Sequence, residues 1–144
     1  MKIAVRYYSK TGNTKKLAEA IAKVAGVPAL PLSAPLTEPV DLLFLDSSVY
    51  AAGVAREVRD FIASLDCARV DEVVCFSTAA LLPSTYAQVS KLLAERNIPV
   101  CTEEFHCRGQ FQFLHRGKPD QEDLTRVQAF AATQIFGGKP HEQR

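Results

Sequence analysis

The sequence predicts an α/β fold: a three-layer α-β-α sandwich with a five-stranded parallel sheet of order 2-1-3-4-5. Short apolar runs alternate with segments of helical periodicity along its 144 residues. Residues 42–45 and 73–76 are continuously apolar, which is typical of parallel strands buried on both faces. Pro28, Pro31 and Pro99 fall in the second and last runs. Because proline cannot donate to a strand ladder, these two runs are expected at the sheet edges.

The strands and helices can be placed in order along the chain. The expected strands are residues 2–8, 27–32, 42–45 and 73–76, and a last strand that starts at 98–101. The first helix follows a turn at residues 9–14 and ends near residue 25, and the others cover about 55–65, 84–96 and 121–136. Residues 33–40 form a connection that is short for a parallel crossover, and residues 105–118 are expected to be irregular.

Two of the helices carry clear boundary signals. Gly26 follows the first helix at the position where helices commonly end. Asp120 is a good N-cap for the last helix, and Asp123 lies near its positive end. Gly137 and Gly138 then end that helix.

Composition and charge exclude several classes of protein. Apolar residues make up 47% and charged residues 23% of the sequence, which is ordinary for a globular protein, and the length fits one domain over residues 1–144. The formal net charge of +1 gives no general attraction for nucleic acid or anionic lipid. No apolar run approaches the roughly 20 residues that span a bilayer. We therefore expect a cytoplasmic protein that binds neither nucleic acid nor membranes, and we expect a monomer.

The thiol and imidazole groups do not suggest a metal centre. No two cysteines form a C-x-x-C pair, and free thiols in the cytosol are the simplest interpretation of Cys67, Cys75, Cys101 and Cys107. His106, Cys107 and His115 have a spacing that matches no usual ligand pair, so no metal is predicted. We expect Cys107 to be an inert thiol.

The turn between the first strand and the first helix is suited to binding an anion. The first N–H groups of a helix have no partners within it, and the aligned peptide dipoles place partial positive charge there. Ser9, Thr11 and Thr14 add hydroxyl donors, and Asn13 adds an amide donor. Gly12 permits a positive φ and a close approach of the backbone to the ligand.

The sequence narrows the kind of anion. It has no G-x-G-x-x-G for a dinucleotide and no G-x-x-x-x-G-K-[ST] for a nucleoside triphosphate. The acidic pocket of a phospho-accepting receiver domain is also missing, since Asp46 is the only acid at the end of the third strand. The turn therefore suits a single phosphate monoester held by neutral donors.

Two further loops are expected beside this turn. In a sheet of this order, ligands bind beyond the carboxyl ends of the strands where the winding direction reverses. The loops at residues 47–53 and 77–82, which are rich in small and hydroxyl side chains, are expected to face the same crevice as residues 9–14.

The motif Ser9-x-Thr11-Gly12-Asn13-Thr14 after a first strand resembles the FMN phosphate-binding signature of the flavodoxin family. The resemblance extends across nearly the whole chain, which is similar to a short-chain flavodoxin-like protein in element order, length and the positions of its loops. It implies a flavodoxin-like fold and non-covalently bound FMN.

The resemblance also implies which residues bind FMN. Ser9, Thr11, Gly12, Asn13 and Thr14 would hold its phosphate. Ser48, Val49, Tyr50 and Ala51 would line one side of the isoalloxazine, with Tyr50 as the stacking partner. Ser77, Thr78 and Ala79 would approach its pyrimidine edge. No catalytic residue is implied.

The sequence departs from the family pattern in two ways. Many flavodoxins have an aromatic residue in both flavin loops, whereas this sequence has no Trp and offers Leu81 and Leu82 in the later loop. Electron-carrier flavodoxins are also typically strongly acidic, whereas a net charge of +1 gives weak steering towards a partner.

The roles of two other groups of residues stay open. Lys10, Lys15 and Lys16 either help to bind a phosphate or dock a partner, or they are simply the solvated start of a helix. The segment at 105–111, with Arg108, either forms a partner surface or packs under the last helix.

Three functions follow from these expectations. The first is an FMN-binding electron-transfer protein, acting as a carrier or as the flavin subunit of a reductase system, with a redox partner protein. The second is an FMN-dependent NAD(P)H:acceptor oxidoreductase, of the quinone type, that acts alone. The third is a flavin-free interaction module with the same fold.

Overall fold

A computed structural model describes residues 1–8, 13–47, 49–50, 53–54, 56–78, 86–107 and 119–137, and at positions 49, 50, 53 and 54 it describes the backbone alone. The main sheet consists of β1 (Ile3–Tyr7), β2 (Ala29–Pro31), β3 (Val40–Asp46), β6 (Val70–Thr78) and β7 (Phe105–Cys107). The helices are α1 (Asn13–Ala25), α2 (Arg56–Ser64), α3 (Tyr86–Ala94) and α4 (Gln121–Phe136).

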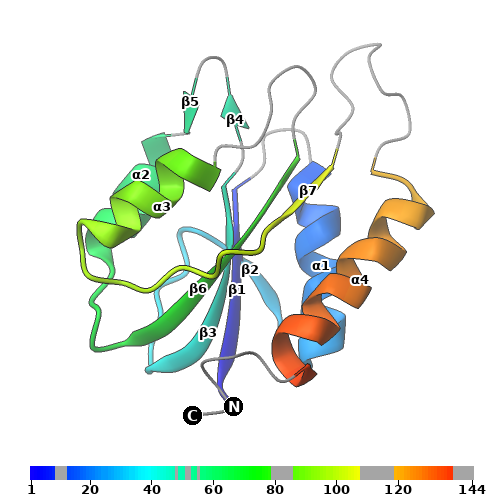
Figure 1. The fold of residues 1–144 in the computed structure, drawn as a ribbon, viewed down its shortest axis with the longest axis horizontal. Coiled ribbons are helices and arrows are strands. Elements are labelled where there is room, and N and C mark those ends of the chain that lie inside the picture. The colour runs from blue at the N-terminus through cyan, green and yellow to red at the C-terminus, as the bar shows by residue number, and fades with distance from the viewer. Residues whose placement is uncertain are drawn as a thin grey trace.

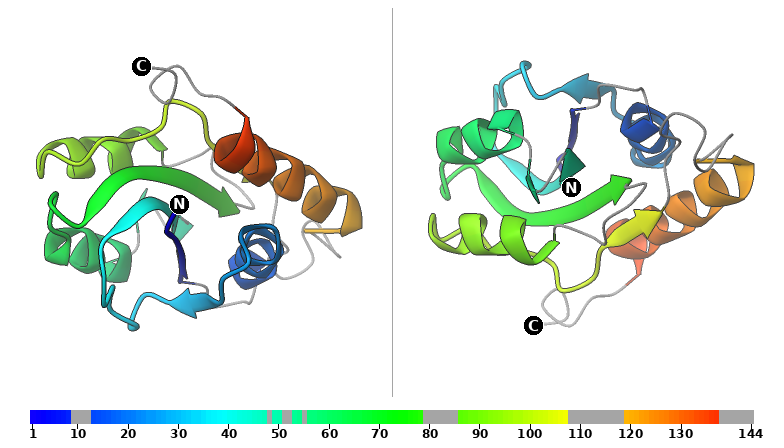
Figure 2. Two further views of the ribbon diagram at one scale, coloured as in Figure 1. Left: turned by 90° about the horizontal axis from the view of Figure 1, so that it is seen from below. Right: turned by 90° about the horizontal axis from the view of Figure 1, so that it is seen from above.

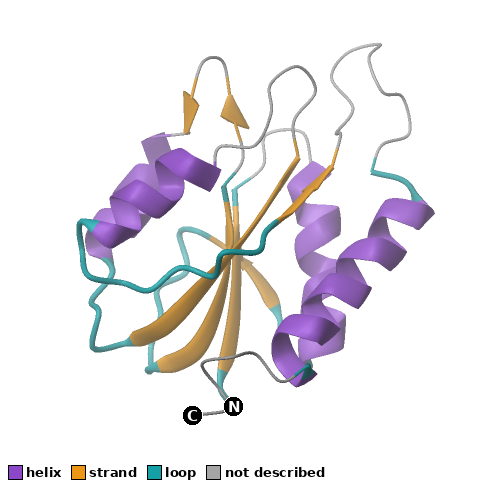
Figure 3. Ribbon diagram, viewed as in Figure 1, coloured by secondary structure: helices purple, strands orange, loops and turns teal. Residues whose placement is uncertain are grey.

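The five strands of the main sheet are parallel and lie in the order β2-β1-β3-β6-β7 (Figures 1 and 3). Counted along the chain, this is the predicted order 2-1-3-4-5. Helices α1 and α4 cover one face of the sheet and α2 and α3 cover the other, as the views along the strands show (Figure 2). The predicted three-layer sandwich is therefore confirmed. Within the described ranges, no helix is long and apolar enough to cross a membrane.

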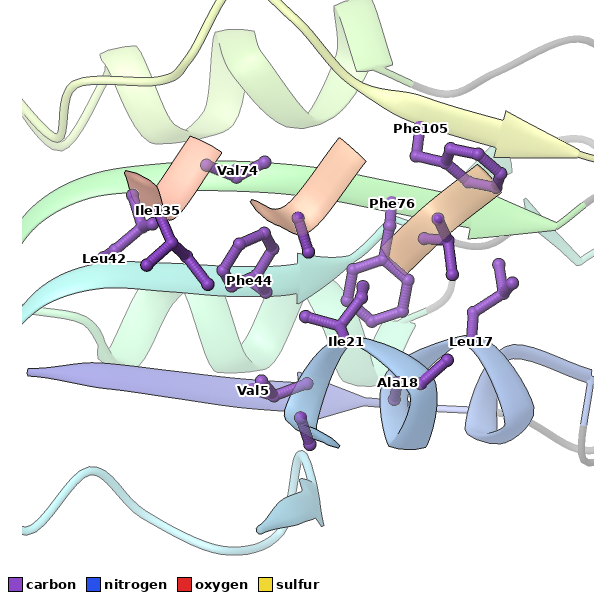
Figure 4. Packing of buried hydrophobic residues seen from close by; sticks show 14 of the residues in the cluster. Val5, Leu17, Ala18, Ile21, Leu42, Phe44, Val74, Phe76, Phe105 and Ile135 are labelled. Atoms are coloured by element: carbon purple, nitrogen blue, oxygen red, sulfur yellow. The ribbon is translucent and has the colours of Figure 1, made fainter. Parts of the chain in front are cut away.

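The sheet separates two apolar cores. In β3, Leu43 and Leu45 belong to the core under α2 and α3, whereas Leu42 and Phe44 belong to the core under α1 and α4 (Figure 4). All four side chains are buried, which confirms the prediction of a strand covered on both faces. The core-facing side chains of α1 include Leu17, Ala18 and Ile21, and those of α4 include Val127, Ala131 and Ile135.

The predicted helix boundaries hold at both marked positions. Gly26 has φ +73°, and its N–H donates to Ala22 O at 2.8 Å, so α1 ends in the left-handed conformation that glycine favours. At the start of α4, Asp123 N donates to Asp120 Oδ1 and Asp120 N donates to Asp123 Oδ2, both at 3.0 Å. This is a capping box, in which two otherwise unpaired N–H groups are satisfied reciprocally.

The last strand differs from the prediction. Residues 98–101 touch the sheet through a single bridge, in which Val73 N donates to Pro99 O at 2.9 Å and Cys101 N donates to Val73 O at 2.8 Å. The last strand of the sheet is instead β7, whose residues were predicted to be irregular. It is a strand because it pairs in parallel with β6, and its buried Phe105 and Cys107 alternate with half-buried His106.

The loops at the carboxyl ends of β3 and β6 also differ from the prediction. Residues 47–53 were expected to form a loop, but β4 (Val49–Tyr50) and β5 (Gly53–Val54) pair as a short antiparallel hairpin. The strand β6 is longer than expected, so Ser77 and Thr78 end a strand rather than begin a loop. Most of the segment at 105–118, residues 108–118, lies outside the described residues.

A buried arginine holds the connection between β2 and β3, which forms no helix. The Arg6 side chain points from β1 onto this connection, where Nε donates to Ala34 O at 2.9 Å and Nη2 donates to Pro35 O at 3.1 Å. Its Nη1 donates to Val5 O at 3.1 Å. Arg6 is only 6% exposed, and this burial lowers its pKa from the usual value. The short crossover is thus fixed by hydrogen bonds to main-chain oxygens.

We predict that Arg6→Ala destabilises the protein by about 2 to 3 kcal/mol, because it removes a buried side chain together with its three hydrogen bonds to main-chain oxygens. Urea unfolding followed by far-UV circular dichroism measures this change. Arg59→Ala, which removes an exposed guanidinium from α2, is the matched control and is expected to change stability by less than about 0.5 kcal/mol. Equal effects of the two substitutions would contradict the role of Arg6.

Candidate functional site

The candidate site lies at the carboxyl ends of the strands of the main sheet. The chain leaves β1 at this end and enters α1, and the β4–β5 hairpin stands at the same end (Figure 1). The last residues of β6 and β7 also lie there. The elements that carry the three predicted loops therefore converge on one end of the sheet, as expected for this topology.

The structure describes only part of the predicted flavin site. Asn13 and Thr14 form the start of α1, Ser77 and Thr78 end β6, and the backbones of Val49 and Tyr50 form β4. Six of the predicted site residues lie outside the described residues: Ser9, Thr11, Gly12, Ser48, Ala51 and Ala79. For all twelve predicted site residues, the contacts with the phosphate and the isoalloxazine ring of FMN stay predictions.

The side chain of Thr14, in the first turn of α1, forms a hydrogen bond to the residue that follows β1. It is buried, and its Oγ1 donates to Tyr8 O at 3.0 Å across the intervening residues. The hydroxyl proton is therefore directed at the chain itself, whereas the sequence assigned it to an anion. The backbone N–H groups of the first helical turn still lack partners within the helix, as at any helix start.

The N–H group of Tyr8 binds a residue that was not among the site residues predicted from the sequence. Asp46, the last residue of β3, accepts a hydrogen bond from Tyr8 N at 2.7 Å through Oδ2. The side chain of Asp46 is 0% exposed, and β3 is the middle strand of the sheet. The available signal was an acid directly after the buried run at residues 42–45, since a carboxylate in that position needs a donor.

The charges at the start of α1 favour an anion. The first turn of α1 contains no acidic residue, and Lys15 and Lys16 are exposed there. By contrast, the first turn of α4 contains Glu122 and Asp123. Cations at the positive end of a helix dipole each cost roughly 0.3 to 1 kcal/mol, and a bound anion would offset this cost. The residues present therefore fit a phosphate group at this helix start.

A histidine of β7, His106, lies beside Ser77 at the end of β6. Ser77 Oγ lies 3.2 Å from His106 Nδ1, so the two side chains meet across β6 and β7. Ser77 is buried and His106 is half-buried. From the sequence, His106 was a candidate metal ligand and part of the segment at 105–111, and it was not paired with Ser77 because that register depends on two segments far apart in the chain.

The four cysteines are free thiols, of which Cys67 is exposed and the other three are buried. None of the four is in a disulfide, and no group of three or more His, Cys, Asp or Glu side chains could hold a metal ion in the described ranges. Cys107 is buried in the core under α1 and α4. Burial raises the pKa of the Cys75 thiol well above its usual value, and the charges of Glu104, Cys101 and Asp46 add to this effect.

Comparisons with known proteins identify the fold. No protein-family model and no curated protein matches the sequence. The crystal structure of oxidised flavodoxin 1 from Bacillus cereus matches with a TM-score of 0.73 at 19% identity, over 96% of this chain and 100% of that chain. A flavodoxin from the domain Archaea matches with a TM-score of 0.73 at 17% identity, over 91% and 94%. An NADH:FMN oxidoreductase in its apo form matches with a TM-score of 0.62 at 14% identity, over 99% and 92%.

We predict that one thiol per chain reacts rapidly with Ellman's reagent at pH 8, because Cys67 is exposed and the other three are buried. The buried thiols are expected to react roughly 100-fold more slowly, through opening of the fold. Cys67→Ser is the control and should remove the fast phase, whereas all four thiols of the original protein should react in guanidinium chloride. A second fast thiol in the native protein would contradict the described core.

Proposed function

We propose that this protein, which has the flavodoxin-like fold, binds FMN at the carboxyl end of its sheet and transfers electrons as a carrier or as the flavin subunit of a reductase system. The observation that carries the proposal is the position of the sequence motif at residues 9–14. The motif lies in the chain between β1 and the start of α1, and β1, β3 and β6 are parallel strands that end on the same side of a fold shared with flavodoxins.

The proposed site divides into a phosphate side and a ring side. The phosphate would be held by Ser9, Thr11, Gly12 and Asn13 together with the first backbone N–H groups of α1, where the helix start carries no acid. Thr14 would contribute its backbone N–H, because its hydroxyl donates to Tyr8 O. The ring would lie between the loop that contains Ser48, Val49, Tyr50 and Ala51 and the residues Ser77, Thr78 and Ala79. FMN supplies the redox chemistry when bound, and the protein binds it, orients it and excludes water.

A stand-alone FMN-dependent NAD(P)H:acceptor oxidoreductase is the second candidate. Two observations favour it: the likeness to an NADH:FMN oxidoreductase and the net charge of +1, which gives weak steering towards a redox partner protein. Anaerobic mixing of the FMN-loaded protein with NADH or NADPH distinguishes the two candidates. A carrier needs a separate reductase, so rapid bleaching of the flavin band by NAD(P)H alone would favour the oxidoreductase.

We expect the purified protein to bind FMN and to quench its fluorescence with a stoichiometry of one FMN per chain. Titration of FMN with the protein after removal of any endogenous flavin measures the dissociation constant. A colourless protein that neither quenches FMN fluorescence nor gains flavin absorption bands would refute the proposal. That result would favour the third candidate, a flavin-free interaction module.

We predict that Thr11→Ala combined with Asn13→Ala weakens FMN binding by about 100-fold, because two hydrogen bonds to a charged group contribute about 3 kcal/mol together. Riboflavin, which lacks the phosphate, should lose less than about threefold. Thr125→Ala, at an exposed position of α4, is the control and should change neither affinity. Equal losses for FMN and riboflavin would show that the turn does not hold the phosphate.

A further inference from the structure

The peptide groups on both sides of Tyr8 are fixed by buried side chains. Tyr8 is the last residue of the chain before the turn at 9–14, and its N–H donates to Asp46 Oδ2 at 2.7 Å. Its carbonyl oxygen accepts from Thr14 Oγ1 at 3.0 Å. Asp46 and Thr14 are 0% and 1% exposed. The point at which the chain leaves β1 is therefore held from β3 on one side and from α1 on the other.

We infer that Asp46 is a positioning residue for the phosphate turn, and that through Tyr8 it determines how strongly the protein prefers a phosphate monoester to the same ligand without its phosphate. The inference rests on the proposed function in so far as FMN is taken as that monoester. Asp46 itself is not expected to contact the ligand, because it is 0% exposed and its carboxylate would repel a phosphate.

The positioning effect of Asp46 on FMN binding can be distinguished from the electrostatic effect of its negative charge. A carboxylate near an anion site repels the anion, so electrostatics alone predicts that FMN binds more tightly once the charge is removed. Positioning predicts the opposite, because a turn whose first peptide is released no longer presents its donors at a fixed place. The two explanations thus differ in sign.

The same strand contains a matched control. Asp41, near the other end of β3, accepts from Lys2 N at 2.7 Å through Oδ2. Each aspartate thus accepts a hydrogen bond, with the same N–O distance, from the backbone N–H of a residue that flanks β1. Asp41 is exposed and lies at the amino end of the sheet, far along the strand from the turn. Replacing it reproduces the loss of such a bond without any effect on the turn.

The experiment compares Asp46→Ala, Asp46→Asn and Asp41→Ala by fluorescence titration with FMN and with riboflavin. In Asp46→Ala we expect FMN affinity to fall at least about tenfold and riboflavin affinity less than about threefold, since only the phosphate depends on the turn. Asp46→Asn retains an oxygen that accepts from Tyr8 N and should recover most of the FMN affinity. Asp41→Ala should leave the ratio of the two affinities unchanged.

Several outcomes would overturn the inference. These are tighter FMN binding by either Asp46 variant, equal losses for FMN and riboflavin, or a selective loss in Asp46→Asn as large as in Asp46→Ala. If Asp46→Ala does not fold, the Asn variant decides, and the ratio of FMN to riboflavin affinity must then stay close to that of the original protein.

A second readout does not depend on flavin. Amide hydrogen exchange in the ligand-free protein should show faster exchange at Tyr8 in Asp46→Ala, together with shifted resonances of residues 9–14. If the original protein binds no flavin, the proposed function fails, but this measurement still tests Asp46. Exchange at Tyr8 that matches the original protein would overturn the inference in either case.

Discussion

The structure depends on the burial of both faces of its parallel sheet. Strands such as β3 place Leu43 and Leu45 in one core and Leu42 and Phe44 in the other, so helices must cover both faces. The loops are then confined to the two ends of the sheet. At the carboxyl end, the apolar runs of β3 and β6 are followed by buried polar residues, Asp46 in β3 and Ser77 in β6. The location of the candidate site follows from this arrangement rather than from any single residue.

Much of the fold could be predicted from the sequence, because its signals are local. Each signal indicates a structure within a few residues of its own position. These signals are the continuous apolar runs, the prolines of the edge strands, Gly26 and Asp120. The strand β7 was missed because its pairing with β6 depends on register, and Phe105–Cys107 is too short for a clear periodicity. The hairpin of β4 and β5 was missed for the same reason, since each strand has two residues.

The candidate site could be predicted only in outline. The motif at residues 9–14 identified the turn, and the strand order identified the end of the sheet to which it belongs. Asp46, which binds the N–H group of the residue before this turn, was not assigned because its contact with Tyr8 spans 38 positions. The same holds for His106, whose contact with Ser77 spans 29 positions. A single sequence shows that such residues are polar but does not show what they bind.

The way in which Arg6 holds the β2–β3 connection has a consequence for how this segment can change. Its two bonds to the connection go to main-chain oxygens of Ala34 and Pro35, and every residue type provides such an oxygen. Substitutions in the connection can therefore leave both bonds in place, whereas an inserted or deleted residue shifts the carbonyl groups away from the guanidinium. At these two positions the segment is constrained in length and not in side-chain identity, whereas Leu32 and Leu36 also pack against the core. Homologues are therefore expected to differ at the two positions by substitution and not by gaps.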